Sequence, residues 1–153
     1  ISVNGVPYVF RDGTGYMEGD RGHSFPMEYL WTQCSFPEGS LMLSVADIPF
    51  GPFRFTGIIG IVHLHGKECR IATYLGAKPV RITPGKIIVR QGNFTLTIEP
   101  EAFSGHPLQA PVGGAMHRTI YEHPSCKVYY RFEINRKTLL ELDAPNAAFE
   151  YEY

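Results

Sequence analysis

Acidic, aromatic and glycine residues crowd together in one stretch near the start of the chain, GYMEGDRGHSFPMEYLWTQCSF, residues 15–36. Neither an ordinary strand nor an ordinary turn requires that combination. Glu18 and Asp20 lie in its first part, in a loop punctuated by glycines. A charged loop beside aromatic rings can form the mouth of a pocket. The plainer alternative is that both carboxylates are solvated at the entry to a strand.

Tyr29, Trp31 and Gln33 stand at alternate positions after this loop. Alternate side chains of a strand point to one face, so we expect the three to share a surface. Two aromatic rings and an amide would then line the pocket beside the loop. The alternative for Trp31 is that it fills the end of a barrel.

His63 and His65, with Glu68 close behind, form the most metal-like pattern in the sequence. Two histidines at i and i+2 on one face of a strand can ligate zinc, iron or nickel. A metal site also needs a third ligand, and the spacing indicates none. In the simpler alternative His63 ends a buried strand and His65 lies in a hairpin turn. We therefore expect no metal.

The three cysteines, Cys34, Cys69 and Cys126, are odd in number and too widely spaced for a disulfide framework. We expect reduced thiols in a cytoplasmic chain, because disulfides are rare in that compartment. Cysteines in strands behave as small hydrophobic residues, and a catalytic thiol needs a base and electropositive surroundings. The sequence predicts neither a signal peptide nor a membrane span.

The composition indicates one globular domain formed by residues 1–153. An apolar content of 44 % argues against disorder. The net charge is −1 and the charged residues are scattered. Binding to nucleic acid requires a basic patch, so we expect no nucleic-acid partner.

Alternating patterns predict an all-β fold. Phe94, Leu96 and Ile98 alternate with polar residues, and residues 128–134 have the same period of two. Turn signals recur about every 8–12 residues, which is typical of an antiparallel barrel or sandwich. We expect a lipocalin-like barrel or a strongly curved sandwich of about 10–12 strands with little or no helix. Residues 100–116, rich in Pro, Gly and Ala, are expected to form a long loop.

Residues 53–65, FRFTGIIGIVHLH, are apolar on both faces of the predicted strand. A strand of this kind is usually covered on both sides, and no amphipathic helix is predicted that could cover it. We therefore expect a cover from another domain of a longer protein or from a second copy. The chain also begins at Ile1 rather than Met, inside an already patterned segment.

The stretch at residues 15–36 resembles the signature of the tocopherol cyclase family. The matching residues are Tyr16-Met17-Glu18, Gly22, Phe25-Pro26, Tyr29, Trp31 and Gln33-Cys34. Further matches follow in chain order, namely Val62-His63 with Gly66-Lys67, Leu108-Gln109-Ala110-Pro111, and residues 140–148. Two positions differ, because Gly19 stands where plant cyclases have Lys and Arg21 where they have Trp.

The resemblance implies a fold and an activity. It corresponds to the C-terminal half of proteins with two lipocalin-like β-barrels, so this chain would be one β-barrel domain. Its partner would be the N-terminal half of the parent protein or a second protomer. The implied activity is acid-catalysed cyclisation of a prenyl double bond onto a phenol, in a hydrophobic prenylated small molecule. No cofactor is needed, and any contact with a membrane surface would be transient.

The implied chemistry assigns roles to residues. A carboxylic acid must stay protonated, which requires burial to lift a pKa of about 4. Glu18 and Asp20 are the candidate catalytic acids. Aromatic faces stabilise a carbocation by about 0.5–2 kcal/mol each, and an amide can orient the phenol. The substrate-binding residues would be Phe25, Tyr29, Trp31 and Gln33.

Two other functions stay open at this point. A non-enzymatic, lipocalin-like carrier of a hydrophobic ligand would leave both loop carboxylates in solvent. An enzyme would instead turn one of them into an apolar cavity. A purely structural half would rely on an acid from the absent N-terminal half.

Overall fold

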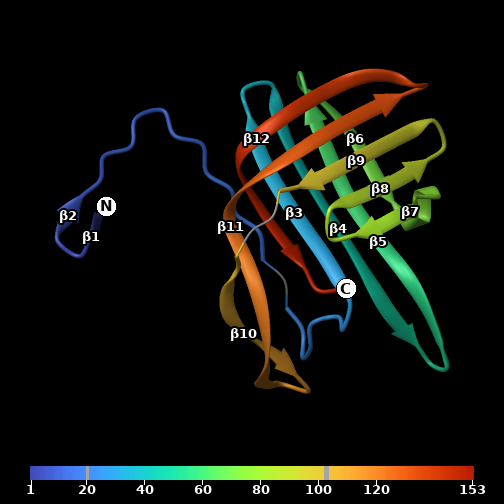
Figure 1. The fold of residues 1–153 in the computed structure, drawn as a ribbon, viewed down its shortest axis with the longest axis horizontal. Coiled ribbons are helices and arrows are strands. Elements are labelled where there is room, and N and C mark those ends of the chain that lie inside the picture. Colours follow the sequence, from blue (N-terminus) through green and yellow to red (C-terminus); the bar gives the residue numbers. More distant parts are fainter. Residues whose placement is uncertain (20, 102–103) are drawn as a thin grey trace.

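Twelve antiparallel strands make up nearly all the regular structure in the part of the chain that the computed structural model describes, residues 1–19, 21–101 and 104–153 (Figure 1). One short 3-10 turn, η1 (Thr73–Leu75), interrupts them. The strands are β1 (Ser2–Val3), β2 (Val6–Pro7), β3 (Tyr29–Phe36), β4 (Gly39–Phe50), β5 (Phe53–Leu64), β6 (Lys67–Ala72), β7 (Lys78–Thr83), β8 (Lys86–Gln91), β9 (Phe94–Pro100), β10 (His106–Val112), β11 (Ala115–Ile134) and β12 (Lys137–Tyr151).

Ten of these strands form one sheet, in the order β6-β5-β4-β3-β12-β11-β9-β8-β7, with β10 paired to β11. The sheet bends so strongly that β7, β8 and β9 cross in front of β4 and β5 (Figure 1). The prediction of an all-β, strongly curved fold is therefore confirmed. Strands β6 and β7 end the order without pairing to each other, so the described sheet is open rather than a closed barrel.

The hydrophobic core lies between the two halves of the bent sheet. Strand alternation sends one set of side chains into it and the other set outward. In β3, Leu30, Thr32 and Cys34 are buried inward, while Tyr29 and Trp31 belong to the outer face. The largest fully buried side chains are Tyr130, Phe132 and Phe149. Buried aromatic rings contribute the largest apolar areas of any side chains, so these three dominate the core.

The side chain of Gln91 partly replaces the missing pairing between the sheet edges. Its Oε1 accepts from the backbone N–H of Ala72 at 2.8 Å, and its Nε2 donates to the carbonyl of Arg70 at 2.9 Å. An amide side chain can imitate a neighbouring strand because it offers one donor and one acceptor. Gln91, at the end of β8, thus connects the far side of the sheet to the edge strand β6.

The expectation of a long loop at residues 100–116 was wrong for most of that stretch. Strand β10 lies within it, and β11 begins at Ala115. Pro107 and Pro111 suggested a loop, yet proline is tolerated in an edge strand, where its missing N–H faces away from the partner. Gly113 and Gly114, both with positive φ, form the tight turn between the two strands.

The first fifteen residues take no part in the ten-stranded sheet. Strands β1 and β2 form a separate hairpin around Asn4 and Gly5, which lies away from the sheet in Figure 1. Among the described residues there is no helix with the length and apolar character needed to cross a membrane.

Gln91→Ala should destabilise the fold by about 1–3 kcal/mol, because the backbone N–H of fully buried Ala72 would lose the amide oxygen to which it donates. The measurement is urea denaturation followed by circular dichroism. Gln109→Ala is the control, since Gln109 is exposed and bonds only to Thr119 of the neighbouring strand. A difference between the two variants below about 0.5 kcal/mol would show that Gln91 does not hold the sheet edges together.

Candidate functional site

A cleft of about 1090 Å³ lies between a loop, of which residues 16–19 and 21–26 are described, and the outer face of β3, β4 and β12. Tyr29 and Trp31 of β3, Ser44 and Ala46 of β4 and Glu150 of β12 form its floor. The wall beyond β12 is formed by the hairpin of β10 and β11. The cleft is therefore on the face of the sheet that points away from the core.

Glu150 is the most perturbed carboxyl group in this cleft. It lies opposite Trp31 of β3 and opposite Glu122 of β11, and it accepts a hydrogen bond from the Tyr29 hydroxyl at 2.8 Å. Burial raises the pKa of Glu150, and the nearby carboxylates of Glu122, Glu152 and Glu18 raise it further. The Tyr29 hydrogen bond opposes this shift but does not cancel it. Glu150 is thus a carboxyl group that holds its proton more tightly than usual.

Glu18 ties the loop to the floor of the cleft. Its Oε2 accepts from Trp31 Nε1 at 3.0 Å and from the Tyr16 hydroxyl. The rings of Tyr16 and Trp31 are tilted against each other with centroids 6.3 Å apart. Burial, and then the bond to Glu18, raises the pKa of Tyr16, so this phenol stays protonated and donates.

The structure brings together four of the six residues that the sequence predicted for the site. Glu18, Phe25, Tyr29 and Trp31 all line the cleft, and Phe25 packs edge-on against Tyr29 with centroids 6.0 Å apart. Gln33 lies further along β3 and donates to Ser35 Oγ at 3.1 Å, outside the described lining. Asp20 is outside the residues that the structure describes.

Arg118 of β11 clamps the end of the loop onto the sheet. Its guanidinium donates to the carbonyls of Pro26 and Met27 at 2.6 and 2.8 Å and pairs with Glu152 at 3.0 Å. It also lies 5.9 Å from the centroid of the Tyr29 ring. A planar guanidinium can make several such bonds at once in fixed directions. Arg118 therefore fixes both the loop and the tyrosine that bonds to Glu150.

Glu150, Glu122 and Arg118 were not singled out from the sequence. At the end of β12, Glu150 alternates with Phe149 and Tyr151, a period of two that is visible in the sequence and separates Glu150 from the buried face. The neighbour of Glu150 is set by the pairing of β12 with β3, and more than a hundred residues separate these two strands in the sequence. A period of two identifies the face of a strand but not its neighbour.

Histidines and cysteines form no ligand cluster in the described part of the chain. Neither they nor the acidic residues there make a group of three or more that could hold a metal ion. His63 is exposed on β5, and His65 has a positive φ of 50° in the hairpin turn. Cys34, Cys69 and Cys126 are free thiols, and burial raises the pKa of Cys34 and Cys126. A thiol with a raised pKa is a poor nucleophile.

A smaller hollow of about 240 Å³ adjoins the cleft, and Trp31, Glu122 and Glu150 line both. Its far side is formed by His123, which is buried and has its Nδ1 3.0 Å from the carbonyl of Phe149. Glu150 therefore borders open space in both the cleft and the hollow.

No family model matches the chain, and neither a curated protein nor a solved structure matches it.

Glu150→Gln should stabilise the fold increasingly as the pH rises. In the unfolded chain Glu150 ionises at its ordinary pKa, whereas the folded chain raises that pKa. The wild type therefore loses stability as the pH rises from the unfolded-state pKa of Glu150 to its folded-state pKa. Glutamine carries no charge, so the variant avoids that loss. The measurement is the free energy of unfolding of both proteins at pH 4, 6 and 8.

Glu38→Gln is the control for this experiment, because Glu38 is exposed in the turn between β3 and β4. The two variants should differ little at pH 4 and diverge at pH 8. A difference that is independent of pH would contradict the raised pKa of Glu150.

Arg118→Gln should cost about 2 kcal/mol of stability, since hydrogen bonds from a charged group contribute about 1.5–3 kcal/mol. It should also increase acrylamide quenching of Trp31, the only tryptophan, because the loop would leave the cleft. Arg70→Gln is the control, because both side chains of the Arg70–Glu68 pair are about half exposed and such pairs contribute about 0–1 kcal/mol. Unchanged quenching in the Arg118 variant would show that the loop is held without the clamp.

Proposed function

We propose that this chain is a tocopherol cyclase-like protein that cyclises a prenyl double bond onto a phenol, with Glu150 as the proton donor. The observation that carries the proposal is the position of Glu150. A half-buried carboxyl group with a raised pKa lies beside Tyr29 and Trp31 in a cleft large enough for a lipid-like molecule. Glu18 and Asp20, the acids expected from the sequence, become secondary candidates.

The reaction balances without an oxidant or reductant. The Glu150 carboxyl gives its proton to the less substituted carbon of the prenyl double bond, which leaves a tertiary carbocation. The phenol oxygen attacks that cation to close the ring, and the phenol proton goes to a carboxylate. The product is an isomer of the substrate, and the acid is regenerated when the proton returns to Glu150.

The residues around Glu150 suit each step. The faces of Trp31 and Tyr29 can stabilise the carbocation, by about 0.5–2 kcal/mol each. Glu18, at the roof of the cleft, can accept the phenol proton. The loop lines one side of the site, and a site from which water is excluded would favour capture of the cation by the phenol over capture by water.

Binding without chemistry is the second candidate function. The cleft is lined by Tyr16, Phe25, Tyr29 and Trp31, and aromatic rings also suit a passive carrier of a hydrophobic ligand. Glu150 separates the two functions, because a carrier gains nothing from a carboxyl group with a raised pKa.

The test is incubation of the intact protein with a prenylated hydroquinone in D₂O, followed by mass spectrometry of the product. Proton-initiated cyclisation places one deuterium on carbon, so the product should be one mass unit heavier than in H₂O. Glu150→Gln should lower turnover by about 100- to 10,000-fold, the usual contribution of a general acid. Hydration would instead add the mass of water, and a carrier would return the substrate unchanged.

Glu18→Gln, Asp20→Asn and Glu38→Gln are the comparison variants. Glu18→Gln should lower turnover less than Glu150→Gln, and Glu38→Gln should leave it unchanged. A loss in the Glu18 or Asp20 variant that exceeds the loss in the Glu150 variant would contradict Glu150 as the donor. Substrate that binds but returns without deuterium in the wild type would favour the carrier.

A further inference from the structure

The hairpin of β4 and β5 ends in an exposed aromatic tip. Phe50 and Phe53 face each other across the Gly51-Pro52 turn, and each side chain is 72 % exposed. Ile48 and Phe55, the next pair on the same face of the hairpin, are exposed as well. Aromatic rings exposed on a turn do not contribute to the core. A group of such rings at one place is typical of a contact site.

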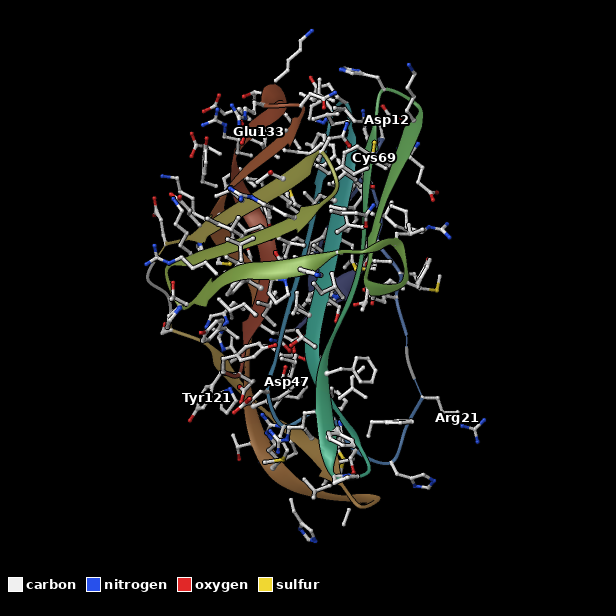
Figure 2. All side chains as sticks on the ribbon, turned by 90° about the vertical axis from the view of Figure 1, so that its right-hand side faces the viewer. Asp12, Arg21, Asp47, Cys69, Tyr121 and Glu133 are labelled. Atoms are coloured by element: carbon white, nitrogen blue, oxygen red, sulfur yellow. The ribbon has the colours of Figure 1, made fainter. Side chains whose placement is uncertain are left out.

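Two further segments carry exposed apolar side chains at the same end of the molecule. The turn between β10 and β11 presents Val112 and Met116, and the loop beside it presents Met27. Backbone bonds from Phe25 to Pro111 and from Gly114 to His23 join that turn to the loop. Both hairpins end at the bottom in Figures 1 and 2, below the level at which Figure 2 labels Asp47. We call residues 21–27, 48–55 and 111–118 the apolar end.

The charges of the apolar end have one sign. Its three segments contain Arg21, Arg54 and Arg118 with two histidines, and no Asp or Glu, although the whole chain has fifteen acidic residues. Arg118 is paired with Glu152, so Arg21 and Arg54 carry the exposed positive charge of this end. Glu28 and Asp47 directly follow or precede the segments, and the N–H of Asp47 bonds to the carbonyl of Glu28 behind the tips. A surface with exposed aromatic rings and only basic charges is complementary to an anionic lipid surface.

We propose that the apolar end docks onto an anionic membrane surface, with Phe50 and Phe53 inserted below the headgroups. The apolar side chains lie on separate convex turns rather than on one continuous flat patch. A protein interface requires a closely packed, contiguous centre, whereas lipids can surround separate tips. The basic side chains around the tips add electrostatic attraction to anionic headgroups.

The docked position would place the cleft at the membrane surface. Arg21, Phe25, Pro111 and Met116 belong both to the apolar end and to the cleft lining. A hydrophobic ligand could then pass between lipid and cleft without crossing water. The membrane contact does not depend on the chemistry proposed for Glu150, because a carrier would need the same access.

The test is co-sedimentation of the intact protein with vesicles of phosphatidylcholine, with and without phosphatidylglycerol. The wild type should bind the anionic vesicles, more weakly at high salt. Replacing Phe50 and Phe53 together by Ser should lower the partition coefficient by about 10- to 100-fold. Arg54→Gln should lower it by about fivefold on anionic vesicles only.

Tyr74→Ser is the matched control, because Tyr74 is 68 % exposed on η1, outside the apolar end. It should bind vesicles as the wild type does, and circular dichroism should show that all variants are folded. No vesicle binding by the wild type would overturn the proposal. Equal loss in the Tyr74 and the double phenylalanine variants would also overturn it. Self-association of the wild type, measured by analytical ultracentrifugation, would also overturn the proposal if the double phenylalanine variant abolished it and neither protein bound vesicles.

Discussion

The pairing of β3 with the end of β12 is the contact on which the rest of the structure depends. It joins two runs of hairpins, β3 to β6 and β7 to β12, into one sheet through residues 30–33 and 148–151. Closing so long a loop costs chain entropy, which burial of Leu30 and Phe149 in the shared core offsets. Because side chains alternate, turning Phe149 into the core turns Glu150 outward against Trp31. The fold thus places the acid in the cleft by the same step that completes the core.

The position of Glu150 is electrostatically unfavourable. Glu122 faces it directly across β11 and β12, and like charges in that arrangement destabilise a sheet. Arg118 does not relieve the repulsion, since it is bonded to Glu152 and to the loop carbonyls. A proton on Glu150 relieves it, in line with the raised pKa of this carboxyl group. Stability alone would favour an uncharged side chain at Glu150, and local conflicts of this kind are typical of functional sites.

The sequence predicted the fold better than it predicted the site. The period of two in β9 and in the second half of β11 marked these strands and their buried faces, because alternation is a local property. It missed β10, where Pro107 and Pro111 masked an edge strand. Within the site, Glu18, Phe25, Tyr29 and Trp31 were found because they adjoin in the chain. Glu150 and Arg118 join them only through pairing and contacts between distant strands, which no local pattern encodes.

The interior of the bent sheet is filled by side chains, so the cleft lies on the outer face. A lipocalin-like barrel can hold its ligand inside, but here Tyr130, Phe132 and Phe149 fill the interior and Tyr130 bonds to Thr32 within it. The cleft exists because residues 16–19 and 21–26 of the loop lie over the outer face. Of its tethers, Arg118 and the Ser24–Gly113 bond come from the β10–β11 hairpin, which also carries part of the apolar end. If that hairpin shifts when it meets a membrane, the roof of the cleft must shift with it. Lipid contact and access to Glu150 would then be coupled through these bonds, without any change in the core.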